Sequence, residues 1–460
     1  MDNLQKIKNV YLLGIGGIGM SALARYFNHT GRNVAGYDKT PTPLTNQLIK
    51  EGMNIHFEDD ISLIPSNWNP NETLAIFTPA LPHDHKELSW FREKPISLLK
   101  RAKVLGLICN EYKGVAIAGT HGKTTTSTIT ATILSKNPNS CGAFLGGISK
   151  NFNSNILLPT EKSEWIVAEA DEFDRSFLHI DPYLALVTSI DADHLDIYDN
   201  KVKMQEAFEK FISNTHEEGC LVVHKNVNID LTKTKAKTYT YAIEGDADFV
   251  AENLRLKPRS RVYTFDIKTP ERTIKNCQMQ HFGLINVENA IGAAALAYFA
   301  GASDSEIRKG IADFSGVSRR FDVRYSDKNK MYIDDYAHHP EELSAVINSV
   351  RKLYPNKKIT GIFQPHLYSR TRDFAKEFAQ SLDLLDETVL IPIYPAREEP
   401  IENISSKTIL DLMKNENKVL LEKKEVAKHI KNSNNEIIMT LGAGDVNMLA
   451  DKIITVLKKQ

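Results

Sequence analysis

Residues 115–126, with the sequence VAIAGTHGKTTT, constrain the fold of this chain more than any other stretch. The apolar residues 115–118 predict a buried strand, and the threonine-rich run from Thr124 predicts the start of a helix. Between them, a glycine turn points free backbone N–H groups and the positive end of a helix dipole at one spot. We therefore expect an α/β fold that binds a phosphate group at this turn.

The turn has the spacing GxxGK[ST], which is shorter than the common eight-residue phosphate loop. Lys123 would reach the outer phosphates of a bound nucleotide, and the hydroxyl of Thr124 would bind Mg²⁺. The alternative is an ordinary glycine turn into a threonine-capped helix, but Lys123 has no packing reason there. The candidate ATP contacts in this turn are Gly119, Thr120, His121, Gly122, Lys123, Thr124 and Thr125.

The length of 460 residues exceeds one hydrophobic core and predicts about three domains. A net charge of −1 argues against nucleic acid as the main partner. The four cysteines are scattered without metal-type spacing, which favours a reduced, cytoplasmic setting. The N-terminus lacks the apolar core of a signal peptide, and no run approaches the roughly 18 apolar residues of a membrane span.

A second glycine motif follows a short predicted strand at residues 9–13. It has the GxGxxG spacing at Gly14, Gly16 and Gly19, and Asp38 ends the next predicted strand about 20 residues later. This is the Rossmann fingerprint, in which the glycines let a diphosphate approach the backbone and the acid binds a ribose. It fits a hydride-transfer enzyme or any protein that binds a nucleotide diphosphate. The alternative is a tight strand–helix turn without a ligand.

Acidic residues gather where two further predicted strands end. The run WIVAEADEFDRS at 165–176 places four acids after an apolar strand, and DADHLD at 191–196 follows the strand at 184–190. Ligands bind at the carboxyl ends of such strands, and Mg²⁺ prefers carboxylate oxygens. We expect Glu169 to bind a metal ion, while His194 is either a second ligand or a structural residue.

Other segments carry weaker predictions. Residues 95–105 predict a helix, and the charged run at 83–87 predicts a solvated helix start, with a binding cluster as the alternative. Alternation over 246–265 predicts antiparallel strands, and Asn286 would cap an alanine-rich helix. On that helix, Asn289 either faces a base or is a polar surface residue. The last part of the chain alternates predicted strands and helices, with polar groups at the strand ends that fit recognition of a carboxylate and an amine.

Together the motifs resemble the Mur ligase family over essentially the whole chain. In order, they read GIGGIGMSALA, GTHGKTTT, EADEFDRSFL, DADHLD, NVEN, SRRFD, DDYAHHPEE, FQPHLYSRTRD and GAGD. The resemblance implies three domains: a Rossmann-like UDP-binding domain at 1–108, a central P-loop ATPase domain with a mixed sheet at 109–317, and a Rossmann-like domain at 318–460. The third domain would close over ATP and carry the amino-acid site.

The first glycine motif and the DDYAHHP and FQPHLYSRTRD segments are most similar to the alanine-adding branch of the family. That branch implies peptidoglycan precursor synthesis from UDP-N-acetylmuramate, L-alanine and ATP with Mg²⁺. ATP would convert the muramic acid carboxylate to an acyl phosphate, which the amine of L-alanine attacks to give the amide, ADP and phosphate. The alternatives are a recycling ligase that attaches a whole peptide and a non-catalytic nucleotide-binding protein. We expect a monomer or weak homodimer.

The resemblance also implies roles for matched residues. The UDP-sugar contacts would be Gly14, Gly16, Gly17, Gly19, Ser21 and Asp38. The catalytic residues would be Lys123, Glu169, His194 and Arg320, with Thr124, Glu169 and His194 on the metal. ATP would also contact Asn289, Arg320 and Asp335, and the amino acid would contact Tyr336, His338, His366 and Arg370.

Several positions depart from the family pattern. Ile285 stands where a histidine is usual, Phe173 where a serine is common, and Leu367 where an arginine is common. Lys210 is out of register with the lysine that several members carbamylate, so we do not predict carbamylation.

Overall fold

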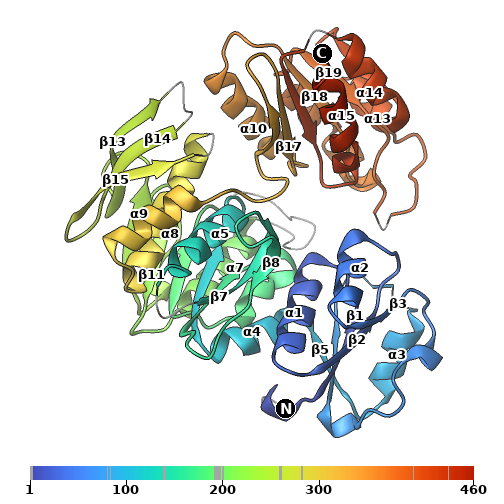
Figure 1. The fold of residues 1–460 in the computed structure, drawn as a ribbon, viewed down its shortest axis with the longest axis vertical. Coiled ribbons are helices and arrows are strands. Elements are labelled where there is room, and N and C mark those ends of the chain that lie inside the picture. The colour runs from blue at the N-terminus through green and yellow to red at the C-terminus, as the bar shows by residue number, and fades with distance from the viewer. Residues whose placement is uncertain are drawn as a thin grey trace. The chain divides into compact units, whose positions relative to one another are not determined.

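The computed structural model describes residues 4–459 except 80, 83, 138–140, 191–197, 199–200, 258–261, 281–282, 397 and 434. It has a three-domain α/β fold with one sheet in each domain (Figure 1). The first two domains form one compact unit, Met1–His281 with Ile285–Ser315, and the third forms a second unit, Phe282–Leu284 with Gly316–Gln460. We describe each unit by itself. No described helix has both the length and the apolar character needed to cross a bilayer.

The first domain is a five-stranded parallel sheet with the order β3-β2-β1-β4-β5. Its strands are β1 (Asn9–Leu13), β2 (Asn33–Tyr37), β3 (Asn54–His56), β4 (Thr73–Phe77) and β5 (Ser97–Lys100). Its helices are α1 (Ile18–His29), α2 (Pro43–Lys50), α3 (Lys86–Glu93) and α4 (Arg101–Asn110). The strand order reverses between β1 and β4, which is where open α/β sheets bind ligands.

The helix predicted at residues 95–105 is wrong in its first half. Residues 97–100 form β5, which pairs with β4 in parallel, and the helix α4 begins only at Arg101. A short apolar run does not distinguish a strand from a helix by its periodicity. Pairing with β4 decides the outcome, because it satisfies backbone groups that an open sheet edge would leave exposed.

The middle domain has ten strands in the order β15-β14-β13-β12-β11-β10-β6-β9-β7-β8. They are β6 (Lys113–Ala118), β7 (Cys141–Ser149), β8 (Ser154–Leu157), β9 (Trp165–Glu169), β10 (Leu184–Val187), β11 (Cys220–His224), β12 (Lys237–Ala242), β13 (Phe249–Lys257), β14 (Val262–Lys268) and β15 (Thr273–Met279). The helices are α5 (Lys123–Leu134), α7 (Lys201–Ser213), α8 (Leu284–Phe299) and α9 (Asp304–Asp313). The predicted antiparallel strands are confirmed as β13 and β14.

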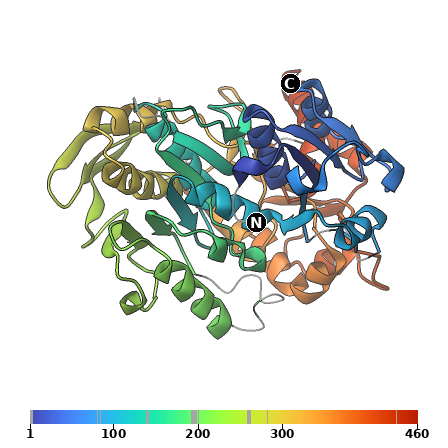
Figure 2. The same ribbon diagram turned by 90° about the horizontal axis from the view of Figure 1, so that it is seen from below.

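The two ends of this mixed sheet differ in their surroundings. At one end the antiparallel hairpin β7–β8 contacts α1 of the first domain, and Phe144 and Ile156 share a core with Met20 and Phe27. At the other end β13, β14 and β15 extend away from the first domain (Figures 1 and 2). The first two domains therefore share a hydrophobic core through this hairpin.

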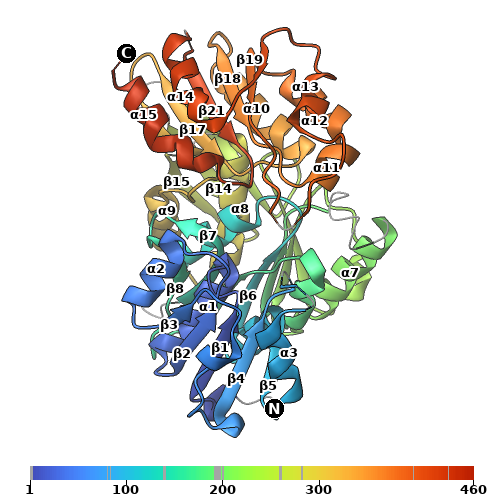
Figure 3. The same cartoon turned by 90° about the vertical axis from the view of Figure 1, so that its right-hand side faces the viewer.

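The third domain has six strands in the order β16-β17-β21-β18-β19-β20, with only β16 antiparallel to its neighbour. They are β16 (Asp322–Ser326), β17 (Met331–Asp335), β18 (Ile359–Phe363), β19 (Glu387–Leu390), β20 (Lys418–Leu420) and β21 (Ile437–Leu441). The helices are α10 (Pro340–Leu353), α11 (Tyr368–Asp373), α12 (Ala375–Leu382), α13 (Ser406–Leu410), α14 (Lys423–Asn432) and α15 (Ala450–Leu457). One apolar cluster packs α10, α12 and α13 against one face of the sheet, and a second cluster packs α14 and α15 against the other face (Figure 3).

Candidate active site

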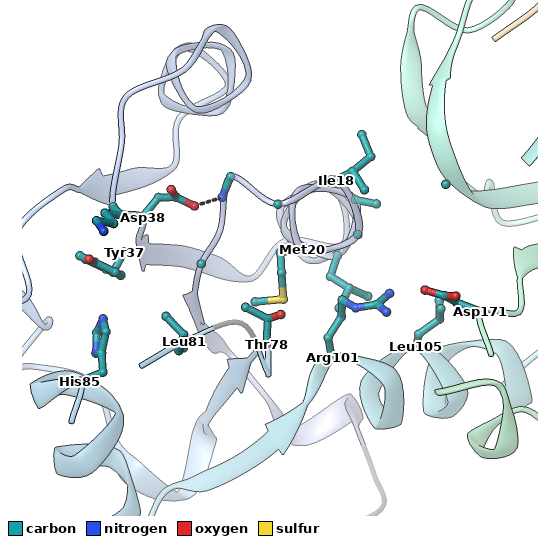
Figure 4. Close-up of a pocket in the computed structure, with 18 of the residues that line it drawn as sticks. Ile18, Met20, Tyr37, Asp38, Thr78, Leu81, His85, Arg101, Leu105 and Asp171 are labelled. Carbon is teal, nitrogen blue, oxygen red and sulfur yellow. Dashed lines mark hydrogen bonds between the residues drawn. The ribbon is translucent and has the colours of Figure 1, made fainter. Parts of the chain in front are cut away.

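A cavity of about 830 Å³ lies between the first and middle domains of the first unit. Its first-domain wall contains the glycine turn after β1 and Asp38, which follows β2. Its middle-domain wall contains residues 144–146 of β7, the last residue of β9, Glu169, and Asp171 (Figure 4). The cavity therefore joins the predicted diphosphate site to the predicted metal site.

The glycine turn is held by its neighbours in the sheet. The N–H of Gly14 donates to the carbonyl of Tyr37 at 2.8 Å, and the N–H of Gly16 donates to the Asp38 carboxylate at 2.7 Å. Gly14 has φ +85°, and a Cβ there would lie 2.9 Å from Thr78. The position therefore requires glycine, because its backbone is left-handed and closely packed. Asp38 lines the cavity and also fixes the turn.

Ser21 lies beneath the first turn of α1 rather than in the cavity wall. It is fully buried, its hydroxyl donates to the carbonyl of Ile18 at 3.0 Å, and it accepts a hydrogen bond from the amide of Asn155 at 3.0 Å. The sequence-based assignment of Ser21 to the UDP-sugar is therefore not supported by its position. The GxGxxG motif did not reveal this partner because Asn155 lies 134 residues away.

The charged run at 83–87 does start a helix, α3, with His85 as its N-cap residue, but the prediction that this start is solvated is wrong for two of its residues. His85 and Glu87 are only 4% and 0% exposed, and His83 lies outside the described residues. The hydroxyl of Tyr11 donates to Glu87 at 2.6 Å. Burial, together with the charge of Asp59, raises the pKa of Glu87 to about 7. His85 lines the cavity beside Tyr37 (Figure 4).

Between β6 and α5, the phosphate turn packs too closely for side chains at its two glycines. Gly119 has φ +132°, and a Cβ there would lie 2.0 Å from the hydroxyl of Thr188. Gly122 has φ +79° and precedes the first residue of α5, and a Cβ there would lie 2.7 Å from Oδ1 of Asn289. Both positions therefore require glycine, because the backbone is left-handed and leaves no room for a Cβ. The turn leads directly into the N-terminus of α5, a place where backbone N–H groups can bind an anion.

The side chain of Lys123 folds over this turn. Its ammonium donates to the carbonyl of Gly119 at 2.6 Å and to the carboxylate of Glu172 at 2.9 Å. Burial alone would lower the pKa of Lys123, but the carboxylates of Glu172, Asp171 and Glu169 outweigh it and raise that pKa. Burial raises the pKa of Glu172, and Lys123 opposes that effect. The lysine therefore stays positively charged.

Glu169 ends β9 beside β6, and its carboxylate accepts a hydrogen bond from the N–H of Gly146 at 3.1 Å. A Cβ on Gly146 would lie 2.1 Å from that carboxylate, so the absence of a side chain makes room for it. Carboxylate and hydroxyl oxygens such as those of Glu169 and Thr124 suit Mg²⁺. No group of three His, Cys, Asp or Glu residues among those described is arranged to hold a metal ion. The third predicted ligand, His194, lies outside the described residues.

Asn289 is 5% exposed, so the prediction of a polar surface residue is wrong. Its Oδ1 accepts a hydrogen bond from the hydroxyl of Thr126 at 3.2 Å, so it supports α5 directly behind the phosphate turn. Asn286 does not cap the helix, because α8 already begins at Leu284. Ile285, at the position where the family usually has histidine, is 49% exposed.

In the second unit, Asp335 is the last residue of β17, and its side chain binds nearby backbone groups. Its carboxylate accepts hydrogen bonds from the N–H groups of Phe321 at 2.6 Å and Ala337 at 2.8 Å. Burial, opposed by Arg320, raises the pKa of Asp335 to about 6. The guanidinium groups of Arg319 and Arg320 lie 5.0 and 5.1 Å from the ring centre of Tyr336.

The structure brings three of the four predicted amino-acid contacts together in this unit. His338 lies between Tyr336 and His366, with ring centres at 5.3 and 6.0 Å, and it contacts the carboxylate of Glu342 at 3.2 Å. Burial would raise the pKa of Glu342, but His338 and Arg320 hold it well below its usual range. Arg370 lies in α11. The residue directly before this helix, Leu367, has a strained backbone with φ +72°.

Arg101 is a cavity residue that the sequence did not single out. It is the first residue of α4, and its guanidinium lies 2.8 Å from a Cβ built on Gly19. In Figure 4 it points from α4 toward the space between α1 and Asp171. The error in the 95–105 prediction hid this residue, because a helix beginning at 95 would place it mid-helix rather than at the carboxyl end of β5.

Three family models match successive parts of the chain. Residues 9–113 match the Mur ligase family catalytic domain, residues 117–297 the Mur ligase middle domain, and residues 319–450 the Mur ligase glutamate ligase domain. Curated relatives match over the full length. The UDP-N-acetylmuramate–L-alanine ligase of Parabacteroides distasonis is 46% identical over 460 residues, which cover 100% of this chain and 99% of the relative.

The chain belongs to the Mur ligase family. Another relative, the UDP-N-acetylmuramate–L-alanine ligase of Flavobacterium johnsoniae, is 47% identical over 98% of both chains. Among solved structures, this Mur ligase is similar to the UDP-N-acetylmuramate–alanine ligase of Thermotoga maritima, with a TM-score of 0.81 and 26% identity over 98% of this chain and 99% of that one. A murein peptide ligase from Psychrobacter arcticus, at 21% identity and TM-score 0.71 over 98% of this chain and 99% of that one, shares the fold.

Proposed function

We propose that this Mur ligase joins L-alanine to the carboxylate of UDP-N-acetylmuramate at the expense of ATP, in peptidoglycan precursor synthesis. The observation that carries the proposal is the single cavity that runs from the glycine turn of the first domain to Glu169 of the middle domain. A sugar nucleotide held by its diphosphate at one end would direct its carboxylate toward the other. The full-length similarity to relatives named for this reaction supports the same substrates.

The first-domain wall supplies the diphosphate contacts. We assign the backbone of Gly14, Gly16, Gly17 and Gly19 to the diphosphate, because the helix α1 begins directly behind this turn. Arg101 supplies the guanidinium that a diphosphate or carboxylate at this place would attract. Asp38 remains a candidate for the ribose, through the carboxylate oxygen that does not accept from Gly16.

The middle domain positions the phosphoryl donor. Residues 119–125 would bind the ATP phosphates, with Lys123 leaving Glu172 to neutralise the charge on the outer phosphates. Thr124 and Glu169 would hold Mg²⁺, which supplies further charge neutralisation when it is bound. His194 remains the predicted second-metal ligand. No side-chain nucleophile is needed, because positioning and electrostatic stabilisation carry phosphoryl transfer.

The remaining assignments are predictions from the family resemblance. Asn289 would face adenine while it supports α5, and Arg320 and Asp335 would contact ATP. Tyr336, His338, His366 and Arg370 would hold the carboxylate and amine of L-alanine. We also propose that the protein is cytoplasmic and that it is a monomer or a weak homodimer. Sedimentation of the pure protein tests the oligomeric state.

The proposal is tested by following phosphate release and amide formation from ATP, Mg²⁺ and UDP-N-acetylmuramate. L-alanine and an L-Ala-γ-D-Glu-diaminopimelate tripeptide are added in parallel, and one sample contains EDTA. We expect release and amide formation with L-alanine, and loss of both with EDTA. Amide formation with the tripeptide alone would identify a recycling ligase instead. Nucleotide binding without either product would identify a non-catalytic binding protein.

A further inference from the structure

A largely buried polar cluster joins α1 to the hairpin β7–β8. It consists of Ser21 and Arg25 on α1, Glu51 after α2, and Asn155 on β8, and we call it the α1–hairpin cluster. Ser21 and Asn155 are fully buried and Arg25 is 7% exposed. Polar groups buried to this extent are costly unless their hydrogen bonds are made.

Asn155 is the centre of the cluster. Its side-chain NH₂ group donates to the hydroxyl of Ser21 at 3.0 Å and to the carbonyl of Ile18, the first residue of α1. Its side-chain oxygen accepts a hydrogen bond from Arg25 at 2.8 Å. A buried amide whose bonds are all made fixes its neighbours, because breaking one bond leaves an unsatisfied group.

Arg25 fixes the same helix in a second direction. Its guanidinium also donates to both carboxylate oxygens of Glu51, at 2.8 and 2.9 Å. Such bidentate pairs set geometry as well as energy, because both groups are planar. The helix α1 is thus tied to the first domain through Glu51 and to the middle domain through Asn155.

The hairpin contacts the predicted metal site through its other strand. Asn155 lies on β8, which pairs with β7, and Gly146 on β7 donates its N–H to Glu169 at 3.1 Å. At the other end of the chain of contacts, Ile18 directly follows the glycine turn. Hydrogen bonds therefore connect the end of the diphosphate turn to Asn155, and the hairpin, whose pairing is irregular between Phe144 and Ser149, continues from Asn155 to Gly146 and its partner Glu169.

We propose that Asn155 is a positioning residue for the ligase reaction. Through Ile18 and Ser21 it sets the place of the diphosphate turn relative to β7 and Glu169, so that the acceptor carboxylate meets the phosphoryl group. The inference rests on the proposed function. Its physical basis is that a misplacement of about 1 Å between reacting groups costs roughly 10²-fold in rate.

The test is the variant Asn155→Asp, which keeps the size of the side chain and its acceptor for Arg25 but removes the NH₂ donor. We expect kcat for amide formation to fall about 10- to 100-fold. Dissociation constants for UDP-N-acetylmuramate and for ADP, measured by calorimetry, should stay at the unmodified values. The matched control is Asn28→Asp on the same helix, because Asn28 donates to the carbonyl of Glu51 at 3.2 Å and, among the described residues, makes no hydrogen bond to the hairpin. Its kcat should not change.

A second variant, Ser21→Ala, tests the same proposal if Asn155→Asp fails to fold. It removes one of the two acceptors of the Asn155 amide, and we expect a smaller fall in kcat with sugar-nucleotide affinity unchanged. A loss of sugar-nucleotide affinity at constant kcat would make these residues substrate contacts and overturn the proposal. Unchanged kinetics with a lower unfolding midpoint would also overturn it, since the cluster would then be only structural. If the unmodified chain forms no amide, the proposed function fails instead.

Discussion

Lys123 and Glu172 form a buried ion pair at the place where the outer phosphates of ATP are expected. The side chain of Glu172 is fully buried, and that of Lys123 is 12% exposed. A buried pair of this kind contributes little net stability, but removing one partner leaves an uncompensated charge. The lysine therefore has a structural partner in addition to its proposed role in phosphoryl transfer.

Replacing Lys123 should separate these two roles. Lys123→Ala should lower turnover at least about 10³-fold, because the outer phosphates lose their cation. It should also lower the free energy of unfolding by about 3 kcal/mol, because the Glu172 carboxylate remains buried without a cation. Sugar-nucleotide affinity should persist, since that site lies on the first domain. Steady-state kinetics, urea denaturation and calorimetry measure the three quantities.

The double variant Lys123→Ala/Glu172→Gln provides the control. A neutral amide needs no cation, so most of the lost stability should return while turnover stays low. If turnover returned with stability, Lys123 would have only a structural role. If sugar-nucleotide affinity fell together with turnover, the proposed division of labour between the first two domains would be wrong.

The raised pKa of Glu87 leads us to expect that the stability of the first domain depends on pH. Its folded-state pKa of about 7 lies above the ordinary value of 4.5, so unfolding releases a proton between these two pH values. Its contribution to stability is therefore complete below about pH 4.5 and is lost as the pH rises through 7. Glu87→Gln should remove this pH dependence from the midpoint of urea unfolding, because glutamine does not titrate. The hydrogen bond from Tyr11 should remain, since the glutamine oxygen can accept it. The control is Glu93→Gln at the exposed end of α3, which should leave the pH dependence of the midpoint as it is in the unmodified protein. If Glu87→Gln showed that same pH dependence, Glu87 would not be its source.

At the scale of single elements, β7 determines where the Glu169 carboxylate lies. Gly146→Ala would place a Cβ 2.1 Å from that carboxylate, and the flexible acid would turn aside. We expect turnover to fall about 10²-fold with little change in stability. On the same strand, Gly142→Ala would instead press on Ile166 at 2.6 Å and should lower mainly the unfolding midpoint. Normal kinetics in Gly146→Ala would show that the position of Glu169 does not matter for the reaction.

Much of the fold could be predicted because the strands that carry the motifs are short, apolar and bounded by glycine or acidic residues. The predicted strand 9–13 coincides with β1, the predicted strand that Asp38 ends corresponds to β2, and the predicted strand 115–118 lies within β6. The strand β5 was missed because its pairing with β4, rather than its own pattern, defines it. Local sequence does not contain such a long-range partner.

The same reason explains the outcome for the candidate site. The glycine turns, Lys123 and Glu169 stand out because their residue types serve phosphate or metal chemistry at a strand end. Asn155 and Arg101 did not stand out, because their importance depends on which distant residues they meet. The burial of His85 and Glu87 was missed for a related reason, since a charged run normally predicts exposure.

At the scale of the molecule, the proposed reaction is divided between domains. The first domain would bind the acceptor, the middle domain would position ATP, and the third domain would carry the amino-acid site predicted from the family resemblance. Phosphoryl transfer to a carboxylate and attack by an amine must then occur in one place. We propose that the acceptor carboxylate is itself phosphorylated before the amide forms.

The most direct test uses UDP-N-acetylmuramate with ¹⁸O in its carboxylate, together with ATP, Mg²⁺ and L-alanine. One labelled oxygen should attack the γ-phosphorus of ATP, and its bond to carbon should break when the amine of L-alanine adds. Mass spectrometry should then find one ¹⁸O in each phosphate released and an amide that retains the other. An amide formed with unlabelled phosphate, or phosphate release without an amide, would contradict the account.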